Sequence, residues 1–206
     1  TLPAVQEAES APARTDMAKL TFAGERAGLV SAPVTLDDSV NITSGSSGSL
    51  YLLRHDPDVL IEIKPGDNGQ PGHAEAVVAD ARRLGLHDAQ GMTSDPASGR
   101  LYILDAAGHR VVQVVPDVRQ GRGADALANG QITSIVLSDA IPPALRGLAF
   151  NPADGHLYVL ARNGQTLYQV DRRGQPAVTY DLAGASLAEP QNILFAPSGD
   201  LTDESW

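Results

Sequence analysis

Two stretches of this sequence match each other residue by residue, and this internal repetition constrains the fold more than any other feature. The stretch QGMTSDPASGRLYIL, from Gln90, aligns without a gap with RGLAFNPADGHLYVL, from Arg146, at an offset of 56 residues. A third copy of the start, QNILFAPSG, begins at Gln191, which is 45 residues after Arg146. Upstream, the pair Leu50-Tyr51 repeats the Leu-Tyr strand of the first stretch 51 residues before it. Phased copies at such intervals indicate a repeat architecture.

One repeat, residues 146–184, contains four short apolar runs separated by three turn signals. The runs are Leu148–Phe150, Leu157–Leu160, Thr166–Val170 and Ala177–Leu182. The middle turn contains Asn-Gly at 163–164, the strongest short signal for a β-hairpin, because a type I′ turn requires φ > 0 at both central residues. Four antiparallel strands joined by tight turns make one sheet, and a row of such sheets around an axis is a β-propeller. We therefore predict an all-β fold, a β-propeller of four-stranded antiparallel blades.

Composition excludes several classes of function. The formal net charge is −10, which argues against nucleic acid binding, because such a surface needs a basic stripe that displaces counterions. No apolar run approaches the length that crosses a bilayer, so we expect no membrane span. The sequence has no cysteine, which excludes disulfides, thiolate metal sites and cysteine nucleophiles within it.

The two ends of the sequence differ from the repeats. Residues 1–19 are rich in Ala, Glu, Pro and Ser, so we expect a flexible leader or linker there, followed by a propeller domain over residues 20–206. The repeat that starts near 191 is incomplete, because residues 201–206 supply at most one strand, and the sequence holds about four blades. Either it is a fragment of a longer chain, which we favour, or residues 20–34 complete the last blade. A ring left open exposes strand edges, through which we expect association.

The repeats resemble those of known propeller families. A strand opening such as Gln90-Gly91 or Arg146-Gly147, followed by an apolar strand, a Gly-containing turn and Leu-Tyr, is similar to NHL repeats and to the bacterial SdiA-regulated and SMP-30/gluconolactonase-like propellers. The resemblance covers residues 44–206 and implies architecture more than activity, since such propellers serve as scaffolds, ligand binders and hydrolases. These families are commonly six-bladed, which would make the sequence part of a six-bladed propeller. We expect an exported protein, extracellular, at the cell surface or periplasmic, because the sequence opens without methionine as a processed chain does.

A ring of polar residues precedes the first strand of each repeat, where a propeller has the mouth of its central channel. By phase, the ring consists of His87, Asp88, Gln90, Arg146, Glu189 and Gln191. Carboxylates, amides, an imidazole and a guanidinium around one cavity would bind a polar ligand, or a hard cation such as Ca²⁺ that takes oxygen ligands. The simpler interpretation is that these are solvated loop residues that cap the hairpin turns, and the sequence leaves both interpretations open.

Two functions from different classes follow. The first is a non-catalytic binding or scaffold module for a protein partner or a polar ligand, without catalytic residues. The second, implied by the resemblance to SMP-30-like lactonases, is a divalent-metal-dependent hydrolase: Asp88, Glu189 and Asn192 offer the ligand types of that family, and the metal would activate water. We favour the first, because the sequence shows no recognisable triad or histidine-based metal site and because Arg146 in the same ring opposes a cation.

Overall fold

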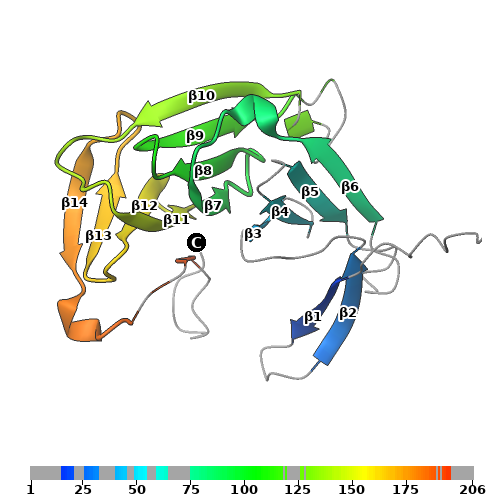
Figure 1. Cartoon of the computed structure of the whole chain (residues 1–206), viewed down its shortest axis with the longest axis horizontal. Coiled ribbons are helices and arrows are strands. Elements are labelled where there is room, and N and C mark those ends of the chain that lie inside the picture. Colours follow the sequence, from blue (N-terminus) through cyan, green and yellow to red (C-terminus); the bar gives the residue numbers. More distant parts are fainter. Residues whose placement is uncertain are drawn as a thin grey trace, which may run out of the picture.

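The described part of the chain consists mainly of three four-stranded antiparallel sheets (Figure 1). The computed structural model describes residues 15–20, 26–32, 40–45, 49–54, 59–64, 75–117, 119, 126–127, 129–188, 190 and 192–195. Blade 1 is β3 (Val40–Ser44), β4 (Leu50–Arg54), β5 (Val59–Lys64) and β6 (Glu75–Asp80). Blade 2 is β7 (Ala89–Ser94), β8 (Leu101–Asp105), β9 (Arg110–Val115) and β10 (Gln131–Val136). Blade 3 is β11 (Leu145–Asn151), β12 (His156–Ala161), β13 (Thr166–Val170) and β14 (Pro176–Asp181).

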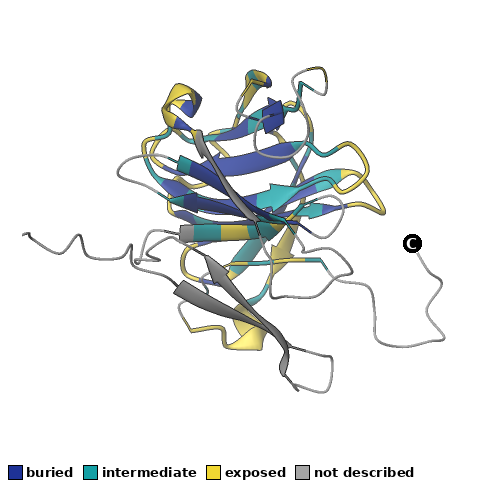
Figure 2. Ribbon diagram, turned by 90° about the vertical axis from the view of Figure 1, so that its right-hand side faces the viewer, coloured by how far each residue is buried: buried dark blue, intermediate teal, exposed yellow. Residues whose placement is uncertain are grey.

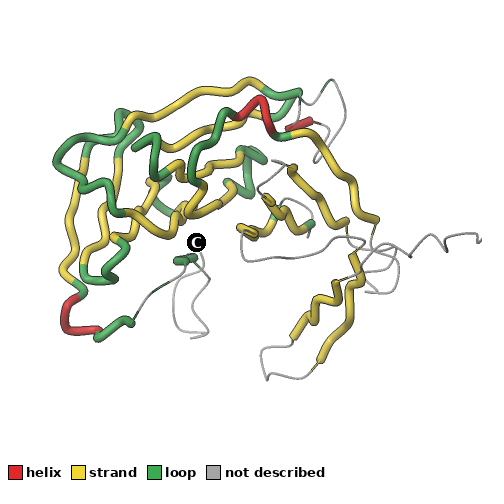
Figure 3. Tube along the Cα trace, viewed as in Figure 1, coloured by secondary structure: helices red, strands yellow, loops and turns green. Residues whose placement is uncertain are grey.

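The blades are arranged around a common centre. The first strands, β3, β7 and β11, lie nearest to that centre in Figure 1, and the last strands, β6, β10 and β14, lie at the periphery. Within each blade, strands that follow one another in sequence are paired, and short loops join most of them (Figure 3). β7 contacts both β3 and β11, so the inner strands form a continuous row. The predicted all-β fold of four-stranded antiparallel blades is confirmed.

Burial explains why the middle strands read as continuous apolar runs. All five residues of β8 are buried, because β8 packs against blade 1 on one face and against blade 3 on the other. Five of the six residues of β12 are buried as well. In contrast, five of the six residues of β14 are exposed. Figure 2 shows the same gradient, with buried strands inside and exposed segments at the edges. Apolar side chains buried on both faces account for the absence of period-2 alternation in the middle strands.

Two apolar clusters hold the three blades together. One joins blades 1 and 2 and includes Leu53, Met92 and Ile103, and the other joins blades 2 and 3 and includes Leu104 and Leu148. Because β8 contributes to both clusters, through side chains on its two faces, blade 2 is the packing centre of the described structure. Burial of apolar side chains is the main source of stability here.

Close backbone approach links the inner strands. A Cβ atom added to Gly91 in β7 would lie 2.6 Å from the backbone nitrogen of Leu148 in β11. One blade further on, a Cβ on Gly147 would lie 3.3 Å from the Cα of Asn192, and Gly147 has φ +86°. Residues 192–195 therefore lie beside β11 in the same way that β11 lies beside β7. They take the position that the inner strand of a fourth blade would have.

Hydrogen bonds between blades supplement this packing. The side-chain amide of Asn41 in β3 donates to the carbonyl of Ala89 in β7 at 3.1 Å. In the next seam, the backbone N–H of Phe150 in β11 donates to the hydroxyl of Thr93 in β7 at 3.1 Å. Each bond satisfies an inner-strand backbone group that its own sheet leaves unpaired on that side.

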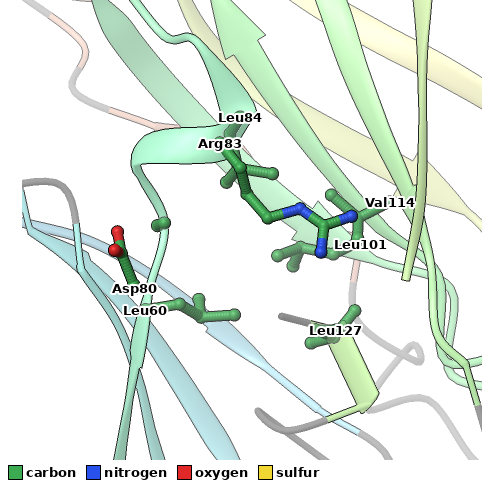
Figure 4. Close-up of a pocket in the computed structure, with 8 residues that line it drawn as sticks. Leu60, Asp80, Arg83, Leu84, Leu101, Val114 and Leu127 are labelled. Carbon is green, nitrogen blue, oxygen red and sulfur yellow. The ribbon is translucent and has the colours of Figure 1, made fainter. Parts of the chain in front are cut away.

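A small cavity of about 10 Å³ lies in the seam between blades 1 and 2 (Figure 4). Its apolar lining consists of Leu60, Ala81, Leu84, Leu101, Val114 and Leu127. The side chain of Arg83 extends across it and donates to the carbonyl of Gly130 at 2.5 Å. This volume is close to the minimum for one water molecule, so the seam is essentially filled by protein.

The N-terminal part differs from the sequence-based expectation. β1 (Thr15–Leu20) pairs with β2 (Arg26–Ala32) in a separate two-stranded sheet, so the last five residues of the predicted leader belong to a strand. Residues 1–14 lie outside the described part. In the described register, β2 pairs with β1 and not with a strand of blade 3. Two 3-10 helices, η4 (Arg82–Leu84) and η5 (Ala183–Ala185), follow blades 1 and 3. Among the described residues, no helix has the length and apolar character of a membrane span.

Candidate functional site

Three residues of the predicted ring are linked by hydrogen bonds at the start of the inner strands. The side-chain amide of Gln90 donates to Oδ1 of Asp88 at 2.5 Å. Across the seam, Nε of Arg146 donates to Oε1 of Gln90 at 3.3 Å. The two bonds connect blade 2 to blade 3 at one end of β7 and β11. We call Asp88, Gln90 and Arg146 the mouth series.

A β-bulge at the same place in two blades positions the mouth series. The pairing of β7 with β8 skips Gln90, and the pairing of β11 with β12 skips Arg146 and Gly147. Extra residues of this kind bend the strand and re-aim a side chain, and they are frequent beside functional sites. The repeated bulge therefore explains why residues 56 positions apart in sequence come within hydrogen-bonding distance.

A buried carboxylate anchors the segment that carries Asp88. The side chain of Asp105, the last residue of β8, is 0% exposed. Its Oδ1 accepts the backbone N–H groups of His87 at 3.1 Å, of Asp88 at 3.0 Å and of Gly108 at 3.3 Å. Its Oδ2 accepts Nε of Arg110 at 3.0 Å. This one side chain thus fixes both the entry to β7 and the turn between β8 and β9.

The protonation state of Asp105 follows from these contacts. Burial alone would raise the pKa of Asp105, because it disfavours the charged form. The hydrogen bonds from the Asp88 N–H, from Arg110 and from His87 outweigh that effect, and the pKa of Asp105 is lowered. The carboxylate therefore remains charged at neutral pH and keeps its acceptor role.

The other predicted ring residues are placed differently. His87 is not joined to the mouth series by a described hydrogen bond; its ring Nδ1 lies 3.3 Å from Oδ2 of Asp105, and its side chain is 69% exposed. Glu189 and Gln191 lie outside the described residues. Asn192 is exposed, and its backbone lies against Gly147 at the neighbouring position of the row.

The predicted metal site has three ligands, of which Asp88 and Asn192 lie among the described residues and Glu189 does not. No group of three or more His, Asp or Glu side chains with metal-binding spacing occurs among the described residues. Oδ1 of Asp88 already accepts a hydrogen bond from Gln90.

The free donors of the mouth belong to Arg146. Its side chain is half-buried, and its Nε is used by Gln90. Among the described residues, none pairs with its Nη1 or Nη2. A guanidinium held through Nε presents its two terminal nitrogens in a fixed plane, which suits a carboxylate with two oxygens. The mouth can therefore hold an acidic group.

Asp105 was not among the residues predicted from the sequence. The repeat gave no indication of this role, because the equivalent residue in blade 3 is an alanine. Asp105 pairs with Ala89 in blade 2, and Ala161 pairs with Leu145 at the same position of blade 3. The available signal was local. A charged residue closes the apolar run LYILD, and Gly108 and Arg110 follow within five positions, which is the pattern of a carboxylate that caps a turn.

Comparisons with known proteins identify the fold. Neither a protein-family model nor a curated protein sequence matches the chain. Glutaminyl cyclase from Myxococcus xanthus is similar in structure, with a TM-score of 0.54 and 15% identity, over 84% of this chain and 69% of that one. Virginiamycin B lyase from Staphylococcus aureus gives a TM-score of 0.52 at 13% identity, over 87% and 53%. A chain of a nidogen–laminin complex gives 0.49 at 13%, over 74% and 51%.

These likenesses bear on architecture alone. The chain spans about half the length of the lyase and of the nidogen–laminin chain. At identities this low, similarity in fold does not carry activity, since function resides in sites placed on folds. The three meander sheets around a common centre, together with the likeness to the cyclase and to the lyase, show that the chain has a β-propeller fold, of which the described residues build three blades.

Proposed function

We propose that this protein is a non-catalytic binding module of the NHL type that its repeats resemble, and that its channel mouth receives an acidic group of a polar ligand or protein partner. The observation that carries the proposal is the orientation of Arg146. Its Nε is held by Gln90, and Gln90 is in turn held by Asp88. A side chain fixed in this way loses less conformational entropy when it binds.

The charges of the mouth favour an acid over a cation. Arg146 brings a positive charge to the site. Asp88 offers a compensating negative charge, but Gln90 occupies one of its oxygens at 2.5 Å. A divalent cation would have to share that carboxylate with the amide, or take its other oxygen, and bind next to a guanidinium. A carboxylate meets two free N–H donors in the geometry of a bidentate pair.

The same residues are suited to hold a ligand rather than to transform it. An amide and a guanidinium donate hydrogen bonds without exchanging protons at neutral pH. The carboxylate of the series, Asp88, accepts the side-chain amide of Gln90, and the neighbouring His87 is directed to the anchoring Asp105. The mouth series therefore supplies recognition, while the protein scaffold supplies rigidity.

The test is the binding of succinate, a simple dicarboxylate, followed by isothermal titration calorimetry and by amide chemical shifts. We expect saturable binding with shifts at Gln90 and Arg146. Arg146→Ala should weaken it at least tenfold, as expected when a charged hydrogen bond of about 1.5–3 kcal/mol is lost, and Arg146→Lys should fall between. Arg173→Ala, which removes an exposed arginine elsewhere, is the matched control and should bind like the wild type.

Two results would overturn the proposal. One is the absence of saturable succinate binding, or equal binding by Arg146→Ala. The other is turnover: hydrolysis of δ-valerolactone in the presence of Ca²⁺, abolished by Asp88→Asn, would establish the metal-dependent hydrolase instead. If succinate and δ-valerolactone are both recovered without chemical change, and succinate binding depends on Arg146, the result supports the binding module.

A further inference from the structure

A second concave site lies between blades 2 and 3, away from the mouth. It has a volume of about 410 Å³, which falls within the range of about 300–1,000 Å³ that is common for small-molecule sites. Asp95 and Gly155, which line it, follow the far ends of β7 and β11. The mouth series stands at the near ends of the same two strands. We call this site the blade 2–3 groove.

The floor of the blade 2–3 groove is apolar and partly aromatic. Leu157 and Val170 of blade 3 line it and are buried. Tyr102 of blade 2 and Phe150 of blade 3 line it as well. Their rings are stacked across the seam, with centroids 5.7 Å apart and planes inclined by 14°. A flat apolar ligand can extend such a stack, because aromatic rings favour offset parallel contact.

The rim of the groove carries two arginines and two aspartates in different states. Asp95 accepts the N–H of Ala97 at 2.9 Å and the hydroxyl of Ser98 at 2.5 Å. In the next blade, Oδ1 of Asp171 accepts two backbone N–H groups of its own turn. Both carboxylates therefore serve as turn caps, a common role for aspartate.

The arginines of the rim have no such partner. Within the described part of the chain, the guanidinium groups of Arg100 and Arg172 make no ion pair or hydrogen bond, although both line the groove. Thr133, which is exposed, belongs to the same rim. Among the charged groups of the rim, those with unused hydrogen bonds are therefore mainly the two arginines. They are cationic donors above an aromatic floor.

We propose that the blade 2–3 groove binds a small aromatic carboxylate. The ring would lie against Tyr102 and Phe150, and the carboxylate would accept hydrogen bonds from Arg100 and Arg172. A guanidinium pairs with a carboxylate through two parallel N–H···O bonds and also stacks on aromatic rings. The site is separate from the mouth in both location and residues, so it does not depend on the function proposed above.

The experiment uses naphthalene-2-carboxylate as the probe and naphthalene-2-carboxamide as its neutral analogue, with affinity measured by calorimetry and location by amide chemical shifts. We expect saturable binding of the carboxylate with shifts at Thr133 and Ser134. Arg100→Ala and Arg172→Ala should each weaken it about tenfold, the size of one charged hydrogen bond. Both should leave the weaker binding of the carboxamide within about twofold.

Two further variants keep the test decisive. Arg162→Ala removes an exposed arginine outside the groove and should leave affinity unchanged. Thr133→Trp places a large side chain over the groove without altering charge and should abolish binding of both probes. Binding of the carboxylate that survives the double variant Arg100→Ala/Arg172→Ala, or shifts confined to the mouth, would overturn the proposal. So would the absence of saturable binding by the folded wild type.

Discussion

Replacing Asp105 with asparagine changes one atom of a fully buried side chain and tests the anchor of the mouth directly. The amide oxygen of asparagine can still accept the three backbone N–H groups that now bond to Oδ1. Its NH₂ group, however, would face Nε of Arg110, which now donates to Oδ2 at 3.0 Å. The substitution therefore removes a charged hydrogen bond and sets two donors against each other.

The magnitude follows from these contacts. Hydrogen bonds to charged groups contribute about 1.5–3 kcal/mol, so Asp105→Asn should lower the free energy of unfolding by about 2–3 kcal/mol. Asp105→Ala also leaves the three N–H groups without a partner and the Arg110 charge uncompensated, which should cost about 3–5 kcal/mol. For a chain of this size, about 2–4 °C of Tm is lost per kcal/mol, so Tm should fall by about 4–12 °C for the asparagine variant.

The lowered pKa of Asp105 determines how the stability difference between wild type and Asp105→Asn should change with pH. Because the pKa of Asp105 is lowered in the folded protein, its stabilising contribution is fully present above the unfolded pKa of about 3.9 and is lost as pH falls through the folded pKa. Asparagine does not titrate. The difference in stability between wild type and Asp105→Asn should therefore be large at pH 7 and smaller at pH 3.

Urea denaturation followed by circular dichroism at both pH values measures this difference. Asp139→Asn, in an exposed turn, is the control and should leave stability nearly unchanged. A difference below about 0.5 kcal/mol at pH 7, the usual effect of a neutral surface substitution, would refute the anchoring role. A difference that is the same at pH 7 and pH 3 would refute the electrostatic reasoning.

Further substitutions test the seams between blades by the same denaturation assay. Gly91→Ala should lower the free energy of unfolding by about 3 kcal/mol, because its Cβ would meet backbone that cannot move aside. Gly155→Ala has open space around its Cβ, so only the strain of its positive φ should count, at a cost of about 1–2 kcal/mol. Gly147→Val combines a φ of +86° with a close contact and should cost about 1–3 kcal/mol or more; an unchanged stability would contradict the aligned positions in the repeat. Thr93→Val removes the acceptor of the Phe150 N–H and should cost about 1–3 kcal/mol, whereas Thr93→Ser should be close to the wild type.

The blades were predictable because each one is encoded locally. A turn glycine such as Gly164, which has φ +71°, and apolar runs such as Leu157–Leu160 determine a strand–turn–strand unit without reference to the rest of the chain. Asn163 does not have the positive φ that a type I′ turn requires. The segment of residues 75–81 has no clear period, and its sequence alone fits either a strand or a helical turn. Its pairing with β5 along the whole length settles it as β6. A tertiary contact decided what propensity left open.

The neighbouring positions of Gln90 and Arg146 were predictable for a similar reason, whereas the groove was not. Gln90 and Arg146 hold equivalent positions in the repeat, so phase alone places them at one end of neighbouring strands. Arg100 and Arg172 belong to different turns of different blades and are not equivalent. Their proximity depends on how far one blade is rotated relative to the next, which no spacing in sequence reports.

The glycine contacts between inner strands also determine curvature. Successive blades are wedges, thin at the centre and wide at the rim, and the angle between them increases as their inner edges come closer together. Because Gly91 has no side chain, the backbone of Leu148 lies close to it, and the angle between blades 2 and 3 is correspondingly large. A larger residue there would separate the inner edges, flatten the row and increase the number of blades needed for a full turn. The size of a side chain at one repeated position thus helps to set the diameter of any ring built from such blades.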